Sequence, residues 1–117
     1  DGQGGEGGTI DGDVFTKSNN TGRFTTDYIP NQYDMTQHLT KLTFTISASS
    51  TTSITFTIYS AQWYELVITN NLEVTTTHTT HTIEFEDFPA PDISMMLFSI
   101  NDLNIPVTLT NVILHSA

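Results

Sequence analysis

Apolar and polar residues alternate with a period of two through much of this chain. The alternation is clearest in residues 41–48, where the apolar positions are Leu42, Phe44, Ile46 and Ala48. It recurs in residues 53–59, 64–69, 82–86, 94–100 and 106–115. Successive side chains of a β-strand point to opposite faces, so each segment is predicted to be a strand with one face in a core.

Weaker alternation in residues 13–17, 23–29 and 72–77 predicts three further short strands. Several connections between strands have hairpin length, and Asn70-Asn71 has the residue type of a tight turn. No segment keeps a helical period over several turns. We therefore predict an all-β fold, a two-sheet antiparallel β-sandwich of eight or nine short strands.

The last predicted strand changes phase in its middle. Val107 and Leu109 share one face, whereas Val112 and Leu114 share the other. An extra residue near Thr110-Asn111, as in a β-bulge, produces such a change. A strand that bends there can pair with different neighbours along its two halves.

The first eight residues include five glycines and no apolar side chain. We interpret residues 1–8 as a flexible Gly-rich linker, because such a composition offers nothing to bury. Residues 9–117 then form a single β-sandwich domain, a length that suits one hydrophobic core.

Charge and composition narrow the classes of partner. The chain has thirteen acidic residues against Lys17, Arg23 and Lys41, a net charge of -10. This balance argues against binding to nucleic acid or to an anionic membrane surface, which needs clustered basic residues. The absence of cysteine excludes disulfides and thiolate-bound zinc. Threonine supplies about a fifth of the chain, a composition common in extracellular β-domains, so we expect a secreted protein.

The main candidate site lies on the predicted hairpin 54–69. If Leu66 and Ile68 face the core, Tyr59 and Trp63 face away from it together. Gln62 lies in the turn between them, and Glu65 and Thr57 follow on the same face. Sugar rings stack their C–H faces on aromatic rings and need amide and carboxylate partners for their hydroxyls. The alternative is that Trp63, the only tryptophan, packs into a core edge.

A second candidate patch is formed by Tyr28, Asn31, Gln32 and Tyr33. Paired tyrosines in a turn-rich segment suit a binding loop. They equally suit a loop whose tyrosines seal the end of the sandwich.

Metal binding and catalysis have little support. His78 and His81 lie three residues apart, which places them on opposite faces of a strand, and we interpret them as solvated. We assign no metal ligands and no cofactor, and keep a structural calcium as an alternative. Its candidate ligands are Asp11, Asp13, Glu84, Glu86, Asp87 and Asp102. No G-x-S-x-G motif occurs, and the short loops give no cleft between paired carboxylates, so we predict no enzyme activity.

Two segments carry a family resemblance: 33–36 leading into 42–46, and the closing segment 107–114. With them the chain resembles the jelly-roll carbohydrate-binding modules attached to secreted bacterial glycoside hydrolases. In those modules an Asp that often precedes the final Asn-Val serves as a calcium ligand. Thr110 occupies that position here, which weakens the transfer of the calcium site.

The resemblance and the hairpin together predict non-catalytic carbohydrate binding, with aromatic stacking that targets an attached enzyme to a polysaccharide. The expected ligands are polymers such as β-glucan, xylan or mannan, and the expected state is a monomer within a multidomain protein. The alternative is a structural or assembly domain of a cell-surface filament, adhesin or phage fibre. In that case a free N-terminal segment would complement a neighbour's sheet.

Overall fold

The computed structural model describes residues 2–19, 23–26, 29–30, 38–60, 65–89 and 93–116. Eleven strands and no helix occur within these ranges. Among the described residues there is accordingly no helix of the length and apolarity that would cross a bilayer.

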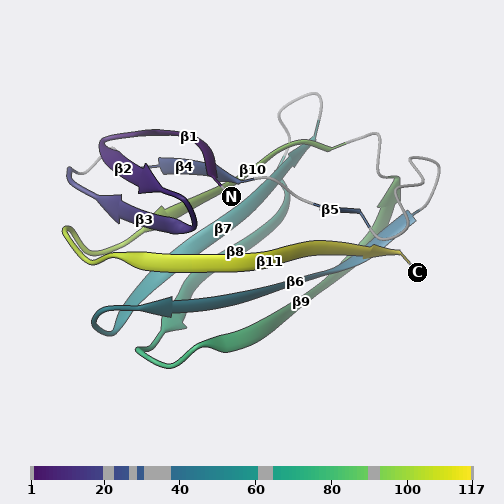
Figure 1. The fold of residues 1–117 in the computed structure, drawn as a ribbon. Helices are drawn as coiled ribbons and strands as arrows, with labels where there is room; N and C mark the ends of the chain where they lie inside the picture. Colours follow the sequence, from purple (N-terminus) through teal and green to yellow (C-terminus); the bar gives the residue numbers. More distant parts are fainter. Residues whose placement is uncertain are drawn as a thin grey trace.

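The strands form two facing sheets (Figure 1). The five-stranded sheet has the order β1 (Gly2–Glu6), β4 (Arg23–Thr26), β10 (Ile93–Ile100), β7 (Thr52–Ser60) and β8 (Glu65–Val74). The six-stranded sheet has the order β2 (Gly8–Asp11), β3 (Val14–Lys17), β11 (Val107–Ser116), β6 (His38–Ala48) and β9 (Thr79–Pro89). Its sixth strand, β5 (Ile29–Pro30), lies beside β11 and is the one parallel pairing among the described strands. The predicted two-sheet β-sandwich is confirmed.

The core contains the residues that the alternation selects. Phe44, Ile46, Ile54, Phe56 and Ile58 are each at most 1% exposed. At its centre, the Phe98 ring contacts three other phenylalanine rings with centroid distances of 4.8 to 6.1 Å; these are Phe15, Phe24 and Phe56. Such aromatic pairs add about 0.5–1.5 kcal/mol each to the area that they bury.

Strand β11 has the predicted bulge. Its register with β6 shifts between Thr110 and Ile113, and Asn111 has a φ of 55°. Before the bulge β11 pairs with β3, and after it with β5. The last strand therefore has different neighbours along its two halves, as its change of phase predicts.

The prediction of a turn at Asn70-Asn71 is wrong. Both residues lie inside β8, which runs unbroken from Glu65 to Val74. The register with β7 shifts across them, and Asn71 has a φ of 52°. Asparagine tolerates the left-handed conformation that both turns and bulges use, so its residue type fits either. The register also pairs Val67 with core residue Ile58 and Ile68 with Thr57, the reverse of the predicted alternation.

The glycine-rich start of the chain forms strands. Residues 2–6, which we interpret above as linker, form β1 and pair with β4. Gly8 lies in β2 beside β3, and a Cβ there would lie 2.7 Å from Phe24 Cζ and closer still to the Thr16 carbonyl oxygen. Only a residue without a side chain fits this approach, so Gly8 is part of the packed sandwich.

Candidate functional site

Most residues of the predicted site lie outside the described ranges. These residues are Trp63 and Gln62 of the first patch and Tyr28, Asn31 and Tyr33 of the second. Tyr59 is described with its side chain, and Glu65 is described in its backbone pairing. The site therefore begins from Tyr59 and the strands beside it.

Tyr59 lies near the end of β7 and is half-buried. Its register partners are Glu65 on β8 and Met95 on β10. The register shifts beside Tyr59 in both pairings, but in each case the extra residue of the bulge lies in the neighbouring strand, β8 or β10. The alternation of β7 itself is therefore unbroken. Tyr59 therefore stays on the face opposite Ile58, away from the core, and Glu65 is its direct neighbour across the strands.

Apolar side chains lie beside Tyr59 on the outer face of the five-stranded sheet. Thr57 shares this face with Tyr59 but is only 5% exposed, and its partner on β10 is the half-buried Leu97. Met95 lies one pair further, opposite Tyr59. A tyrosine flanked by methionine and leucine can offer a C–H-rich ligand a flat, weakly polar surface.

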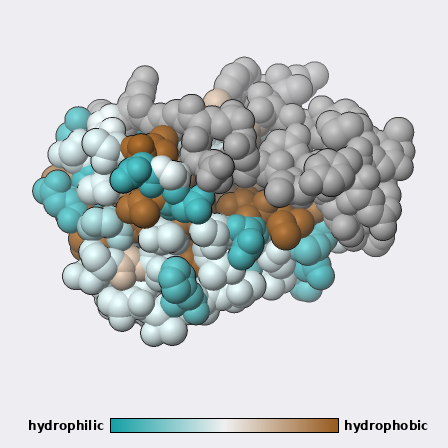
Figure 2. Space-filling view, in the orientation of Figure 1, coloured by the Kyte–Doolittle hydropathy of each residue, from teal (hydrophilic) through white to brown (hydrophobic). Residues whose placement is uncertain are grey.

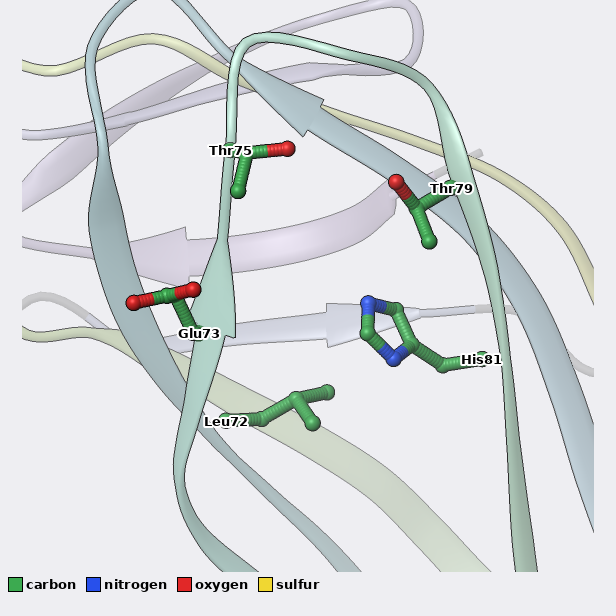
Figure 3. Close-up of a pocket in the computed structure, with 5 residues that line it drawn as sticks. All are labelled: Leu72, Glu73, Thr75, Thr79 and His81. Carbon is green, nitrogen blue, oxygen red and sulfur yellow. The ribbon is translucent and has the colours of Figure 1, made fainter.

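A pocket opens where the chain crosses from one sheet to the other. Strands β8 and β9 are the edge strands of the two sheets, and the turn at 75–78 joins them (Figure 1). The cavity beneath this turn has a volume of about 270 Å³. We call it the arch pocket; its lining residues are Leu72, Glu73, Thr75, Thr79 and His81 (Figure 3).

Hydrogen bonds fix the rim of the arch pocket. The hydroxyl of Thr79 donates to the Thr77 carbonyl oxygen at 3.0 Å, and the hydroxyl of Thr75 donates to the same oxygen at 3.4 Å. The Thr77 amide in turn donates to the Thr75 hydroxyl oxygen at 3.4 Å. The turn thus uses its own threonines to hold the two strand ends together.

His81 is not the solvated residue that we predicted. It is half-buried, and its ring centroid lies 5.7 Å from that of Phe44. Figure 3 shows the imidazole pointing from β9 into the space between the strands, with Leu72 reaching in from β8. His81 shares the parity of Ile83 and Phe85, which pack against the core, and that alternation is the sequence signal for its position. His78, by contrast, is exposed.

The outer face of the six-stranded sheet has one titratable contact of note. His115 Nε2 lies 2.7 Å from the Thr43 hydroxyl, and Lys41 is the register partner of His115. Burial and the nearby Lys41 charge lower the pKa of His115 from its ordinary value of 6.5. Figure 2 shows that weakly polar residues predominate over β6, β9 and β11. In the described part of the chain, no three His, Asp or Glu side chains gather as metal ligands.

The sequence matches no protein-family model and no curated protein. Solved structures of similar fold do exist. A CBM4 structure has a TM-score of 0.63 and 11% identity, over 89% of this chain and 70% of that one. The BiXyn10A CBM1 structure has a TM-score of 0.58 and 11% identity, over 95% and 92%. A family 29 carbohydrate-binding module from Piromyces equi has a TM-score of 0.56 and 11% identity, over 96% and 76%.

These neighbours define the class of fold. The chain has the β-sandwich of the jelly-roll carbohydrate-binding modules, and the predicted resemblance to them is confirmed at this level.

Proposed function

We propose that this domain binds carbohydrate without catalysis and holds an attached enzyme on a polysaccharide. The observation that supports the proposal most is the position of Tyr59. It lies on the outer face of the five-stranded sheet, with Glu65 as its partner on one side and Met95 on the other. The solved structures that share this fold are named as carbohydrate-binding modules.

The proposed mechanism is stacking with polar selection. The Tyr59 ring supplies a face for pyranose C–H groups, and we propose that Trp63, which follows β7 in the sequence, adds a second ring to the platform. The hydroxyls of the sugar would be matched by Gln62 and Glu65, since an amide both donates and accepts hydrogen bonds and a carboxylate accepts them. Tyr28, Asn31 and Tyr33, the second patch predicted from the sequence, are proposed to contact the same polymer.

Affinity electrophoresis tests this proposal. The intact domain is run through gels that contain β-glucan, xylan or mannan, and we expect at least one polymer to retard it. Tyr59→Ala should lower the association constant about ten-fold, because an aromatic contact contributes about 0.5–1.5 kcal/mol beyond the area that it buries. Trp63→Ala should abolish retardation.

The matched control is Leu103→Ala. Leu103 is 43% exposed in the connection between β10 and β11, so its removal should leave retardation unchanged. If no polymer retards the intact domain, the proposed function is wrong. If Leu103→Ala weakens binding as much as Tyr59→Ala, the site is misplaced.

In the alternative, an assembly domain, a free N-terminal segment could join a neighbour's sheet. Residues 2–6 instead pair with β4 of the same chain. That observation favours the binding module over the assembly domain.

A further inference from the structure

We propose that the arch pocket is a second carbohydrate site, one that takes a single sugar residue at a chain end. The inference rests on the proposed function for its class of ligand. The two sites lie at different places on the molecule. Glu65 lies beside Tyr59, Glu73 lies at the pocket, and the two are eight residues apart along β8. At about 3.3 Å per residue this separation is roughly 25 Å.

The size of the pocket sets the size of the ligand. Its volume of about 270 Å³ lies just below the roughly 300–1,000 Å³ of pockets that hold drug-sized molecules. A space of this volume suits one pyranose ring. Because the pocket lies under the turn that joins β8 and β9, we infer that the ring is the end residue of a sugar chain.

The chemistry of the lining suits a neutral, hydroxyl-rich ring. The apolar side chain of Leu72 and the ring face of His81 lie against the same space (Figure 3). The Glu73 carboxylate accepts hydrogen bonds only, and a neutral imidazole donates one and accepts one. The C–H groups of a sugar would lie against Leu72 and the ring face of His81, and its hydroxyls would bond to the Glu73 carboxylate and the His81 ring nitrogens.

Two polar side chains of the pocket, Glu73 and His81, have groups that a ligand could use, whereas the hydroxyls of Thr75 and Thr79 are engaged with Thr77. Among the described residues, the Glu73 carboxylate has no hydrogen-bond partner, and the His81 ring packs against the Phe44 ring with a centroid distance of 5.7 Å. That contact orients the imidazole before any ligand arrives, which lowers the entropy lost on binding. An anionic ligand is disfavoured by Glu73 and by the net charge of -10.

Nuclear magnetic resonance can test the site directly. The domain with ¹⁵N-labelled histidine is titrated with monosaccharides and with the disaccharide and trisaccharide units of β-glucan, xylan and mannan. We expect the ring nitrogens of His81 to shift with saturation, and those of His78 to stay in place. Glu73→Gln should weaken the binding read from the His81 shifts about ten-fold, because it replaces a charged acceptor by a neutral one. His81→Phe, followed by calorimetry because it removes the reporter ring, should weaken binding by a similar factor through loss of a hydrogen bond.

Two controls separate this site from the outer face of the five-stranded sheet. Glu84→Gln changes an exposed carboxylate on β9 outside the pocket and should bind as the native domain does. Tyr59→Ala should leave the His81 shifts intact. Because Glu73 is exposed, we expect Glu73→Gln to fold normally. This variant therefore tests the pocket even if His81→Phe does not fold.

The outcomes distinguish the two proposals. Retardation by a polymer without any shift at His81 overturns the second site and leaves the proposed function standing. A saturable shift at His81 without retardation supports the pocket and overturns polymer targeting by the outer face. The pocket is refuted if Glu73→Gln binds with the native affinity, as read from the His81 shifts. It is also refuted if the His81 shifts vanish in Tyr59→Ala.

Discussion

Replacing Gly8 by alanine tests whether the glycine-rich start of the chain belongs to the fold. In a linker, alanine would be neutral or slightly favourable, because it restricts the unfolded chain. In the structure, the new methyl group would meet Phe24 Cζ at 2.7 Å, where ordinary van der Waals contact begins at 3.4 Å, a shortfall of 0.7 Å. The two descriptions therefore predict opposite signs.

The magnitude follows from what would have to move. The Thr16 carbonyl oxygen is a backbone atom of β3, and Phe24 is fully buried against Phe15 and Phe98. Neither can retreat without shifting a strand or the aromatic core. Overpacking of this kind costs about 1–3 kcal/mol, and two conflicts at once place Gly8→Ala near the upper end. The melting temperature should fall by roughly 10 °C.

Urea unfolding followed by circular dichroism measures the change, with Gly12→Ala as the matched control. Gly12 has a φ of +61°, but nothing lies within 4 Å of its added Cβ. Alanine there should cost about 1 kcal/mol through its conformation alone. A Gly8→Ala domain as stable as the native one, or more stable than Gly12→Ala, would refute the packed position of Gly8.

Three further predictions concern other parts of the sandwich. Asn111→Val should lower the free energy of unfolding by about 1–2 kcal/mol, because valine resists the φ of 55° at the bulge, whereas Asn111→Gly should not destabilise; urea midpoints compare the two. Phe98→Ala should cost about 3–5 kcal/mol in the same assay, and a loss below 1 kcal/mol would contradict the aromatic centre of the core. Because the folded pKa of His115 lies below 6.5, its stabilising contribution is full above about pH 6.5 and is lost as the pH falls toward the lowered value. His115→Gln should therefore lose less stability than the native domain between pH 7.5 and 5.

Much of the fold is predictable from local alternation. The core faces of β6, β7 and β10 follow from a period of two, and the bulge in β11 follows from one break in that period. Both are properties of adjacent residues. The glycine strand β1 is different, because glycine has no side chain to alternate and its pairing depends on β4, far along the chain. The turn predicted at Asn70-Asn71 is a bulge inside β8, and the sequence does not separate the two because both use the left-handed backbone conformation of Asn71.

The candidate site shows the same division. The outward position of Tyr59 follows from the unbroken alternation of β7. The arch pocket depends on where β8 leaves one sheet and β9 enters the other, and no local pattern specifies that crossing. The inward position of His81 can still be predicted, since His81 has the parity of Ile83. Glu73 becomes a pocket residue only because the tertiary fold brings β8 beside β9.

The place of β11 in its sheet has a consequence for biosynthesis. It is the last described strand in chain order, yet it lies in the middle of the six-stranded sheet, between β3 and β6. Until it leaves the ribosome, those two strands lack their shared partner and the core lacks Val107, Leu109, Val112 and Leu114. Folding of this domain must therefore await the synthesis of β11, and until then the nascent chain exposes the strand edges of β3 and β6 that β11 will cover. A chaperone that protects these edges would have to bind before β11 is synthesised and release the domain once β11 is available to pair.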